Sequence, residues 1–255
     1  MIQITGLSKV YGRQTALEDF SVTVASGEIV GVLGPNGAGK STLIKILAGI
    51  ILPTAGSALV AGFDILHSAI EVKRRVGYLP ESASFFDSLS ALEYVDFVAR
   101  LHRLESRTAH QRRDEIFDLL KLGGGTNKPM AQLSKGTRQK VALCAALIHR
   151  PNVLLLDEPF DGLDIEAAMI VRELLRQLAA CAESTVLLSS HMVSTVEELA
   201  TTVLIMNDGR RLACDTPDQL SAAVGATTLE DAFRMIVRVE APSKRVANFI
   251  AAHQD

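Results

Sequence analysis

The sequence predicts an α/β fold with a mostly parallel central sheet, and three observations support this fold class. Residues 29–33 form a short apolar run that ends at a glycine, and residues 153–156 and 185–188 are two further short apolar runs. Runs of this kind are typical of strands buried on both faces of a parallel sheet. Residues 166–180 show a helical pattern between the last two runs, where a crossover helix between parallel strands belongs.

The N-terminal region is expected to form an antiparallel β-subdomain, followed by a strand, a glycine-rich loop and a helix. Apolar and polar residues alternate near the start of the chain, with apolar side chains at positions 2, 4, 17, 20, 22 and 24, which predicts short strands. Residues 41–51 carry apolar side chains at helical spacing, and Pro53 is expected to close that helix. The strand at residues 29–33 therefore leads through the glycine loop into a helix.

A helical lobe of about residues 85–150 is predicted to be inserted into this α/β frame. Residues 88–150 contain three helical patterns, including residues 91–104 and 109–122, with a glycine run at 123–125 between patterns. We assign residues 1–240 to one domain and residues 241–255 to a polar C-terminal tail. The length of 255 residues fits one large α/β domain that carries an inserted lobe.

The composition is that of a folded protein and shows no electrostatic footprint for nucleic acid. Apolar residues make up 48% of the chain, the net charge is −3 and the pI is near 6.1, so we expect no nucleic-acid partner. No apolar run approaches the roughly 18 residues of a membrane span, and the N-terminus lacks a secretory signal, which predicts a cytoplasmic protein. Cys144, Cys181 and Cys214 have neither paired nor metal-type spacing and are expected to be reduced packing residues.

A glycine-rich loop between the strand at 29–33 and the following helix predicts a site for ATP and Mg²⁺. The loop and the residue after it are Gly34, Pro35, Asn36, Gly37, Ala38, Gly39, Lys40, Ser41 and Thr42. The glycines let backbone N–H groups converge on phosphates, and the helix N-terminus adds positive potential. Lys40 is expected to reach the β and γ phosphates, and the Ser41 hydroxyl to ligate Mg²⁺.

Polar residues at the ends of two later strands complete this chemistry. Asp157 and Glu158 follow the apolar run at 153–156, at the sheet edge that lines ligand crevices in open α/β folds. We expect Asp157 to hold Mg²⁺ and Glu158 to orient or deprotonate the attacking water. His191 follows the run at 185–188 and is expected to reach the same edge, near the γ-phosphate.

The residues at the start of a second helix allow two interpretations, a helix cap and an anion site. Residues 133–137 open a helix, and Ser134 is a good N-cap for it. A helix N-terminus with a hydroxyl and with Gly136 is also an anion site.

The order of these motifs resembles that of the ATP-binding cassette family, over nearly the whole chain to about Phe233. The phosphate loop, the signature at 133–139, the strand at 154–158, the loop at 161–164 and His191 follow one another as in that family. The resemblance implies that Tyr11 stacks on adenine and that Asp164 lies in the loop that crosses a dimer interface. It implies that Ser134 and Gly136 cap the γ-phosphate bound by a second subunit, in a head-to-tail homodimer that closes on two ATP molecules.

Three residues depart from the pattern of the family. Glu81 follows residues 76–80 where the family has glutamine, so a carboxylate would ligate Mg²⁺ beside the triphosphate. Lys135 replaces the usual second glycine of the signature, and Thr137 stands where glutamine is common. Lysine is unfavourable against the helix dipole but favourable against a γ-phosphate.

These departures, with residues 78–81 and 229–233, are similar to the exporter branch whose membrane subunits are separate chains. We therefore expect a polytopic membrane permease as partner and a peripheral position on the inner face of the cell membrane. Phe85 and Phe86 are either core residues or anchors for that partner. The alternatives are a soluble cassette ATPase that acts on ribosomes or DNA, and a regulatory module that binds ATP without hydrolysing it.

Overall fold

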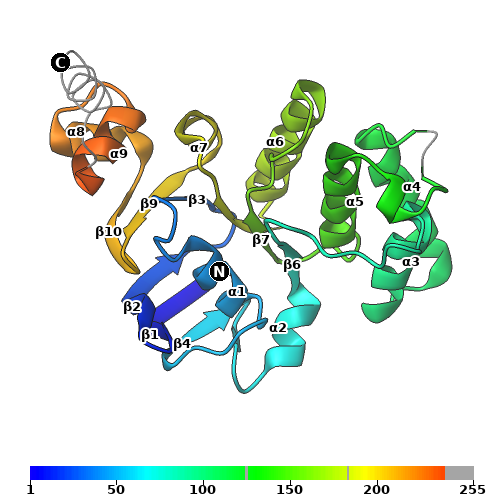
Figure 1. Cartoon of the computed structure of the whole chain (residues 1–255), viewed down its shortest axis with the longest axis horizontal. Helices are drawn as coiled ribbons and strands as arrows, with labels where there is room; N and C mark the ends of the chain where they lie inside the picture. The colour runs from blue at the N-terminus through cyan, green and yellow to red at the C-terminus, as the bar shows by residue number, and fades with distance from the viewer. Residues whose placement is uncertain (124–125, 183, 239–255) are drawn as a thin grey trace, which may run out of the picture.

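In the described part of the chain, two sheets with helices around them make up the fold (Figure 1). The computed structural model describes residues 1–123, 126–182 and 184–238, and the tail expected at 241–255 lies outside this part. Among the described residues, no helix combines the length with the apolar character that a membrane span requires.

The larger sheet confirms the predicted parallel core. Its strands run in the order β10 (Arg210–Asp215), β9 (Thr202–Asn207), β3 (Ile29–Leu33), β8 (Thr185–Ser189), β7 (Val153–Asp157) and β6 (Val76–Leu79). All neighbours are parallel except β10 and β9. The three predicted strands are therefore β3, β7 and β8, which lie side by side at the centre of the sheet.

The central strands are buried on both faces because their alternate residues belong to two different cores. Val30 and Val32 pack with the N-terminal sheet and with α1 (Lys40–Leu47), which contacts β2 on one side and β7 and β8 on the other. Ile29 and Leu33 belong to the opposite core, which includes residues of α6 (Ile165–Ala180) and α7 (Val193–Leu199). This two-sided burial explains the uninterrupted apolar runs of the sequence.

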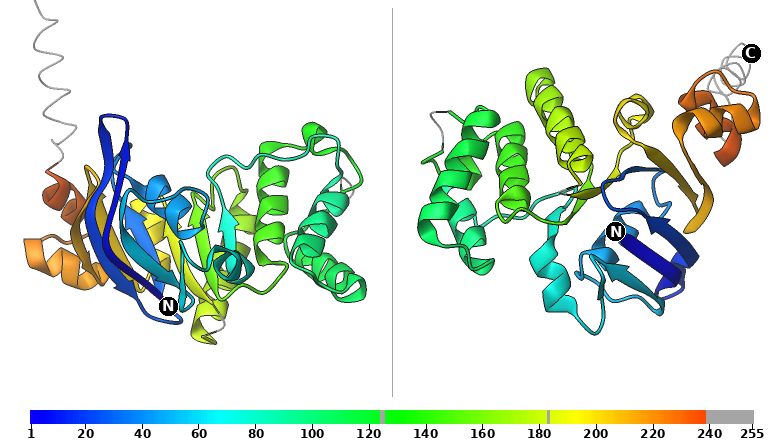
Figure 2. Two further views of the ribbon diagram at one scale, coloured as in Figure 1. Left: turned by 90° about the horizontal axis from the view of Figure 1, so that it is seen from below. Right: turned by 180° about the vertical axis from the view of Figure 1, so that it is seen from behind.

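The smaller sheet is the expected antiparallel N-terminal subdomain. Its strand order is β2 (Gln14–Val24), β1 (Ile2–Tyr11), β4 (Ala55–Val60) and β5 (Phe63–Asp64). β1 and β2 are longer than the short strands that the sequence predicts, with 10 and 11 residues. Tyr11 pairs with Gln14 across the turn, and Figure 2 shows this hairpin end projecting from the sheet.

The lobe helices gather at one end of the molecule and the last two described helices at the other (Figures 1 and 2). The lobe consists of α3 (Ala91–Leu101), α4 (Ser106–Leu119), a 3-10 turn (Met130–Gln132) and α5 (Lys135–Leu147). The other end carries α8 (Pro217–Val224) and α9 (Leu229–Val237), and α2 (Ala69–Arg75) precedes β6. α4 begins before the predicted residue 109 because the Glu105 side chain accepts hydrogen bonds from the N–H groups of Arg107 and Thr108.

Two further sequence predictions are wrong in detail. The helix expected at 41–51 ends at Leu47, because Gly49 takes a left-handed φ of +66° and the N–H of Ile50 bonds back to the Lys45 carbonyl. This is a helix-ending motif that glycine favours. Cys181 is exposed, so it does not pack in a core, whereas Cys144 is buried and Cys214 half-buried.

Candidate functional site

The candidate site lies where the carboxyl ends of three parallel strands meet. In the register of the sheet, Asp157 at the end of β7 pairs with Ser189 of β8, and Ser189 pairs with Val32 of β3. The loops that follow these strands therefore start at the same edge, as expected for ligand sites of open α/β sheets.

A cavity of about 380 Å³ opens at this edge and brings most of the predicted nucleotide residues together. It is lined by Tyr11, Gln14, Ala16, residues 36–42, Glu81, Asp157 and Glu158. Sequence reasoning missed Gln14 and Ala16, which β2 places here. The pairing of Gln14 with Tyr11 across a two-residue turn is the signal that could have found Gln14.

The glycine loop lies so close to neighbouring strands that side chains are excluded at Gly34 and Gly39. A Cβ atom on Gly34 would lie 2.5 Å from the carbonyl oxygen of Met206 in β9. A Cβ on Gly39, whose φ is +103°, would lie 2.4 Å from the carbonyl oxygen of Ala16 in β2. α1 begins directly after Gly39 without a side-chain cap, so its first N–H groups remain available to an anion.

The Lys40 side chain is held inside the loop by two backbone carbonyl groups that precede it in the chain. Its Nζ donates hydrogen bonds to the carbonyl oxygens of Gly34, at 2.6 Å, and Pro35, at 3.2 Å. Burial lowers the pKa of Lys40, and the carboxylates of Glu158, Asp157 and Glu81 act in the opposite direction. Gly34 and Pro35 thus support the lysine and do not line the cavity themselves.

Asp157 is a buried carboxylate with one oxygen unsatisfied. Its exposure is 1%, Oδ1 accepts a hydrogen bond of 2.5 Å from the Ser189 hydroxyl, and Oδ2 has no hydrogen-bond partner among the described residues. A buried unpaired carboxylate oxygen is unfavourable without a cation or donor. The Ser41 hydroxyl lines the same cavity, and a carboxylate, a hydroxyl and substrate phosphates are a typical ligand set for Mg²⁺. The residues present therefore fit this ion.

Glu158 is placed by its backbone and by His191. Its φ of +53° lies in the left-handed region, which costs a non-glycine residue about 1–3 kcal/mol. The N–H of Glu158 donates to Ser189 Oγ at 3.1 Å, and Glu158 Oε2 lies 2.8 Å from His191 Nδ1. His191 thus reaches the expected edge, although its side chain is 64% exposed and does not line the cavity.

Ser134, Gly136 and Asp164 lie outside the nucleotide cavity of their own chain. Ser134 is the N-cap of α5, since its Oγ accepts a hydrogen bond from the N–H of Thr137 at 3.2 Å. Asp164 is the N-cap of α6 and pairs with Lys140 of α5 at 3.0 Å. The structure therefore confirms that Ser134 caps the helix that begins at the signature.

The signature helix α5 is hydrogen-bonded to the chain that follows β7. Gln139 donates from Nε2 to the carbonyl oxygens of Glu158, at 3.3 Å, and Pro159, at 3.2 Å. Lys135 pairs with Asp161 at 2.6 Å, so its charge is matched within its own chain. The lobe thus contacts the loop that follows Glu158 through an amide and an ion pair.

Comparisons with known proteins match this arrangement. The model of the ABC transporter family matches residues 17–161. The daunorubicin resistance ATP-binding protein DrrA3 of Streptomyces coeruleorubidus is 36% identical over 233 residues, which are 91% of this chain and 73% of that protein. The bacitracin transport ATP-binding protein BcrA of Bacillus licheniformis is 34% identical over 212 residues, 83% of this chain and 68% of that protein.

A solved ATP-binding subunit of an ABC transporter has the same fold. It superimposes with a TM-score of 0.86 at 28% identity, and the match covers 92% of this chain and 99% of that subunit. The family model spans more than half of this chain, and the phosphate loop, the signature and the strand before Glu158 follow one another in the order noted for the family. This chain therefore belongs to the ABC transporter family and is one of its ATP-binding, ATP-hydrolysing subunits.

Proposed function

We propose that this subunit drives export through a separate membrane permease, as a head-to-tail homodimer that closes on two ATP molecules. The observation that carries this proposal is the position of Ser134 and Gly136, which lie outside the nucleotide cavity of their own chain. In a two-fold dimer each copy can offer these residues to the cavity of the other. The relatives named for daunorubicin resistance and for bacitracin transport favour export.

ATP is proposed to bind along the cavity from the hairpin end to the strand edge. The Tyr11 ring is 47% exposed and lies 4.9 Å from Lys9 Nζ, so adenine can stack on its other face. The phosphates then reach the N-terminus of α1, residues 36–42 and the Lys40 ammonium. Domain residues 1–240 are proposed to carry this binding function.

Mg²⁺ is proposed to be held by Asp157, Ser41 and Glu81 together with the phosphates. The free Oδ2 of Asp157 supports this assignment, and Glu81 is an exposed carboxylate at the same cavity. When bound, the ion would neutralise charge on the phosphates during transfer. The protein's own part is to hold the three oxygen ligands at one edge of the cavity.

Replacing Glu81 with glutamine is expected to raise the Mg²⁺ concentration needed for half-maximal ATP hydrolysis by about fivefold. A carboxylate near a cation contributes on the order of 1 kcal/mol in water-like surroundings, and glutamine lacks that charge. A Mg²⁺ titration of ATPase activity measures the shift. Glu230→Gln, an exposed carboxylate of α9, is the matched control, and coinciding curves for Glu81→Gln and the parent would refute the assignment.

Hydrolysis is proposed to depend on Glu158 and His191. Glu158 lines the cavity and can orient or deprotonate water there, while the 2.8 Å contact with His191 Nδ1 fixes the position of its carboxylate. His191 is proposed to respond to the γ-phosphate, because its exposed ring lies next to the catalytic group. Its contact with Glu158 joins the two strand ends, β7 and β8, at the proposed reaction centre.

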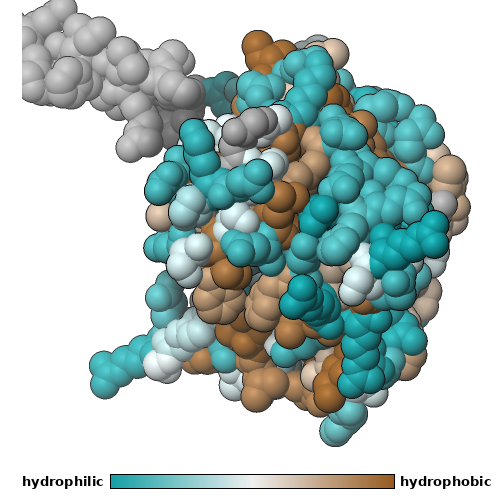
Figure 3. All heavy atoms as spheres, turned by 90° about the vertical axis from the view of Figure 1, so that its right-hand side faces the viewer, coloured by the Kyte–Doolittle hydropathy of each residue, from teal (hydrophilic) through white to brown (hydrophobic). Residues whose placement is uncertain are grey.

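A groove between the lobe and the sheet is proposed as the docking site of the permease. It has a volume of about 340 Å³ and is lined by residues that include Ile50, Pro80, Tyr94 and Val98. Phe85 is half-buried against Tyr94, whereas Phe86 is 58% exposed and lies edge-on to Phe97. The two phenylalanines therefore differ: Phe85 packs against the core, and Phe86 is available to a partner. Figure 3 looks onto the lobe and shows hydrophobic patches between hydrophilic residues.

Two stacked histidines line this groove. The rings of His102 and His149 lie 3.7 Å apart, and His149 Nε2 lies 3.1 Å from the Val76 carbonyl oxygen, to which it must donate. Burial and the neighbouring His102 lower the pKa of His149 to about 4. His149 therefore stays uncharged at neutral pH, which suits an apolar partner.

Affinity purification of the tagged chain from native membranes tests the proposal. We expect a polytopic membrane protein to copurify, identified by mass spectrometry, with ATPase activity in the same sample. This would place the subunit in the cytoplasm, peripheral to the inner face of the cell membrane. Recovery of ribosomes or DNA-bound proteins with intact ATPase would leave the nucleotide site standing and overturn the transport function.

The same purification tests the groove. Ile50→Asp places a charge on an exposed groove residue, and we expect it to abolish copurification of the membrane protein. Leu212→Asp is the matched control, because Leu212 is also exposed but lies on β10, away from the lobe. Equal recovery with both variants would place the permease elsewhere.

A further inference from the structure

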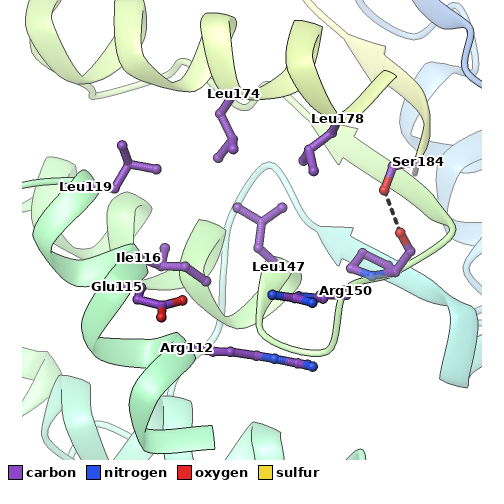
Figure 4. Close-up of a pocket in the computed structure, with 10 residues that line it drawn as sticks. Arg112, Glu115, Ile116, Leu119, Leu147, Arg150, Leu174, Leu178 and Ser184 are labelled. Carbon is purple, nitrogen blue, oxygen red and sulfur yellow. Dashed lines mark hydrogen bonds between the residues drawn. The ribbon is translucent and has the colours of Figure 1, made fainter. Parts of the chain in front are cut away.

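A second cleft, of about 470 Å³, separates the helical lobe from α6 (Figure 4). Ile116 and Leu119 of α4 face it from the lobe, Leu147 closes it from the end of α5, and Leu174 and Leu178 point into it from α6. None of these residues lines the nucleotide cavity or the docking groove. The cleft therefore presents a leucine-rich wall that the proposed function does not use.

Two arginines stand at one side of this apolar wall. Arg112 and Arg150 lie side by side there, and neither has a carboxylate within 4.0 Å in the described part of the chain (Figure 4). Burial and the charge of Arg150 lower the pKa of Arg112, which Glu115 partly offsets. Arg112 Nη1 donates to the Ile148 carbonyl oxygen at 3.3 Å, which uses one of its five donors.

Among the described residues that line the cleft, Glu115 is the one acid, and it does not neutralise the pair. Its Oε1 accepts a hydrogen bond from Gln111 at 2.8 Å. Counted over the described lining residues, two guanidinium groups against one carboxylate leave one positive charge in excess beside the leucines. The guanidinium fork is suited to bidentate binding of a carboxylate or phosphate.

We propose that this cleft binds an anionic amphiphile with a single acyl chain, its chain along the leucines and its carboxylate on Arg112 and Arg150. The volume is in the range of small-ligand pockets, which combine an apolar lining with a few convergent polar groups. Helices from the lobe and from the core flank the cleft, and the leucines beside two arginines match an apolar chain that ends in an anionic group.

The occupant would contact both the lobe and the core. α6 starts at Asp164, which pairs with Lys140 of the signature helix α5. A ligand between α4 and α6 gains its full binding energy at one spacing of lobe and core, so it favours that spacing over others. The cleft is thus a regulatory site for the arrangement of the signature.

Calorimetric titration of the purified full chain with decanoate, below its micelle concentration and without nucleotide, tests the proposal. We expect saturable binding at one site, and binding at least about tenfold weaker for 1-decanol, which lacks the charge. We expect the double variant Arg112→Gln/Arg150→Gln to weaken decanoate binding by about tenfold or more, because a charge-assisted hydrogen bond is lost. The same substitutions should leave decanol binding unchanged.

Arg100→Gln/Arg107→Gln is the matched control, because it removes two exposed lobe arginines outside the cleft. Leu119→Asp, at an exposed position of the cleft, gives a second test if the double variant does not fold, and we expect it to weaken decanoate binding as well. The proposal is overturned by absence of saturable decanoate binding to the parent, by equal affinity for decanol, or by unchanged affinity in the cleft variants. None of these outcomes depends on ATP hydrolysis.

Discussion

Replacing Glu158 with glutamine is expected to slow ATP hydrolysis by about 10²–10³-fold while ATP binding is retained. Glutamine keeps the size of the side chain. It can still accept the hydrogen bond that the backbone N–H of His191 donates to Glu158 Oε2 at 3.3 Å. It cannot take a proton from water at neutral pH. Because phosphoryl transfer depends on positioning and on charge, a loss confined to the catalytic rate identifies a base or water-orienting group.

Phosphate release at saturating ATP measures the rate, and filter binding of labelled ATP measures affinity. Glu173→Gln is the matched control, since Glu173 is an exposed carboxylate of α6 that bonds to Gln177. The Glu158 variant should hold ATP for longer than the parent does. Equal rates of phosphate release by Glu158→Gln and the parent would remove Glu158 from its catalytic role and favour a regulatory module.

The core of the fold was predictable because its signals are local. β3, β7 and β8 are apolar on both faces, and α6 repeats its apolar residues at helical spacing. β9 has the same apolar character in residues 203–206, and the same signal could have found it. β10 was not predictable in this way, because it is an edge strand with two arginines and only weak alternation. The end of α1 depends on the backbone of Gly49, which apolar spacing does not report.

The site was predictable where one chain segment supplies the chemistry, as in residues 34–42. The β2 contribution required the register of the hairpin, which places Ala16 against Gly39. The unsatisfied oxygen of Asp157 and the left-handed backbone of Glu158 arise from the packing of β7 against β8. The charge match between Lys135 and Asp161 joins segments 26 residues apart, so sequence alone left the signature lysine free for a phosphate.

A negative charge at Ser134 is expected to reduce hydrolysis by roughly 10³-fold without unfolding α5. Aspartate is as good an N-cap as serine, so the Thr137 N–H, 3.2 Å from Ser134 Oγ, keeps its acceptor. In the proposed dimer the new carboxylate would face the γ-phosphate held by the other copy. Two like charges at ~4 Å repel by about 4 kcal/mol in partly solvated surroundings. Ser134→Asn keeps the cap without the charge and is the matched control.

Mixing the Ser134→Asp subunit with a Lys40→Ala subunit is then expected to restore hydrolysis. Each variant alone is inactive, because one lacks a usable signature and the other lacks the ammonium that holds the phosphates. Half of the dimers in an equal mixture are hybrids, and each hybrid has one complete site in two, so we expect about a quarter of the parental rate. Recovery requires that the phosphate loop of one copy works with the signature of the other. If hydrolysis stays absent in a mixture in which hybrid dimers are shown to form, the signature does not act across the dimer, and Ser134 is only the cap of its own helix.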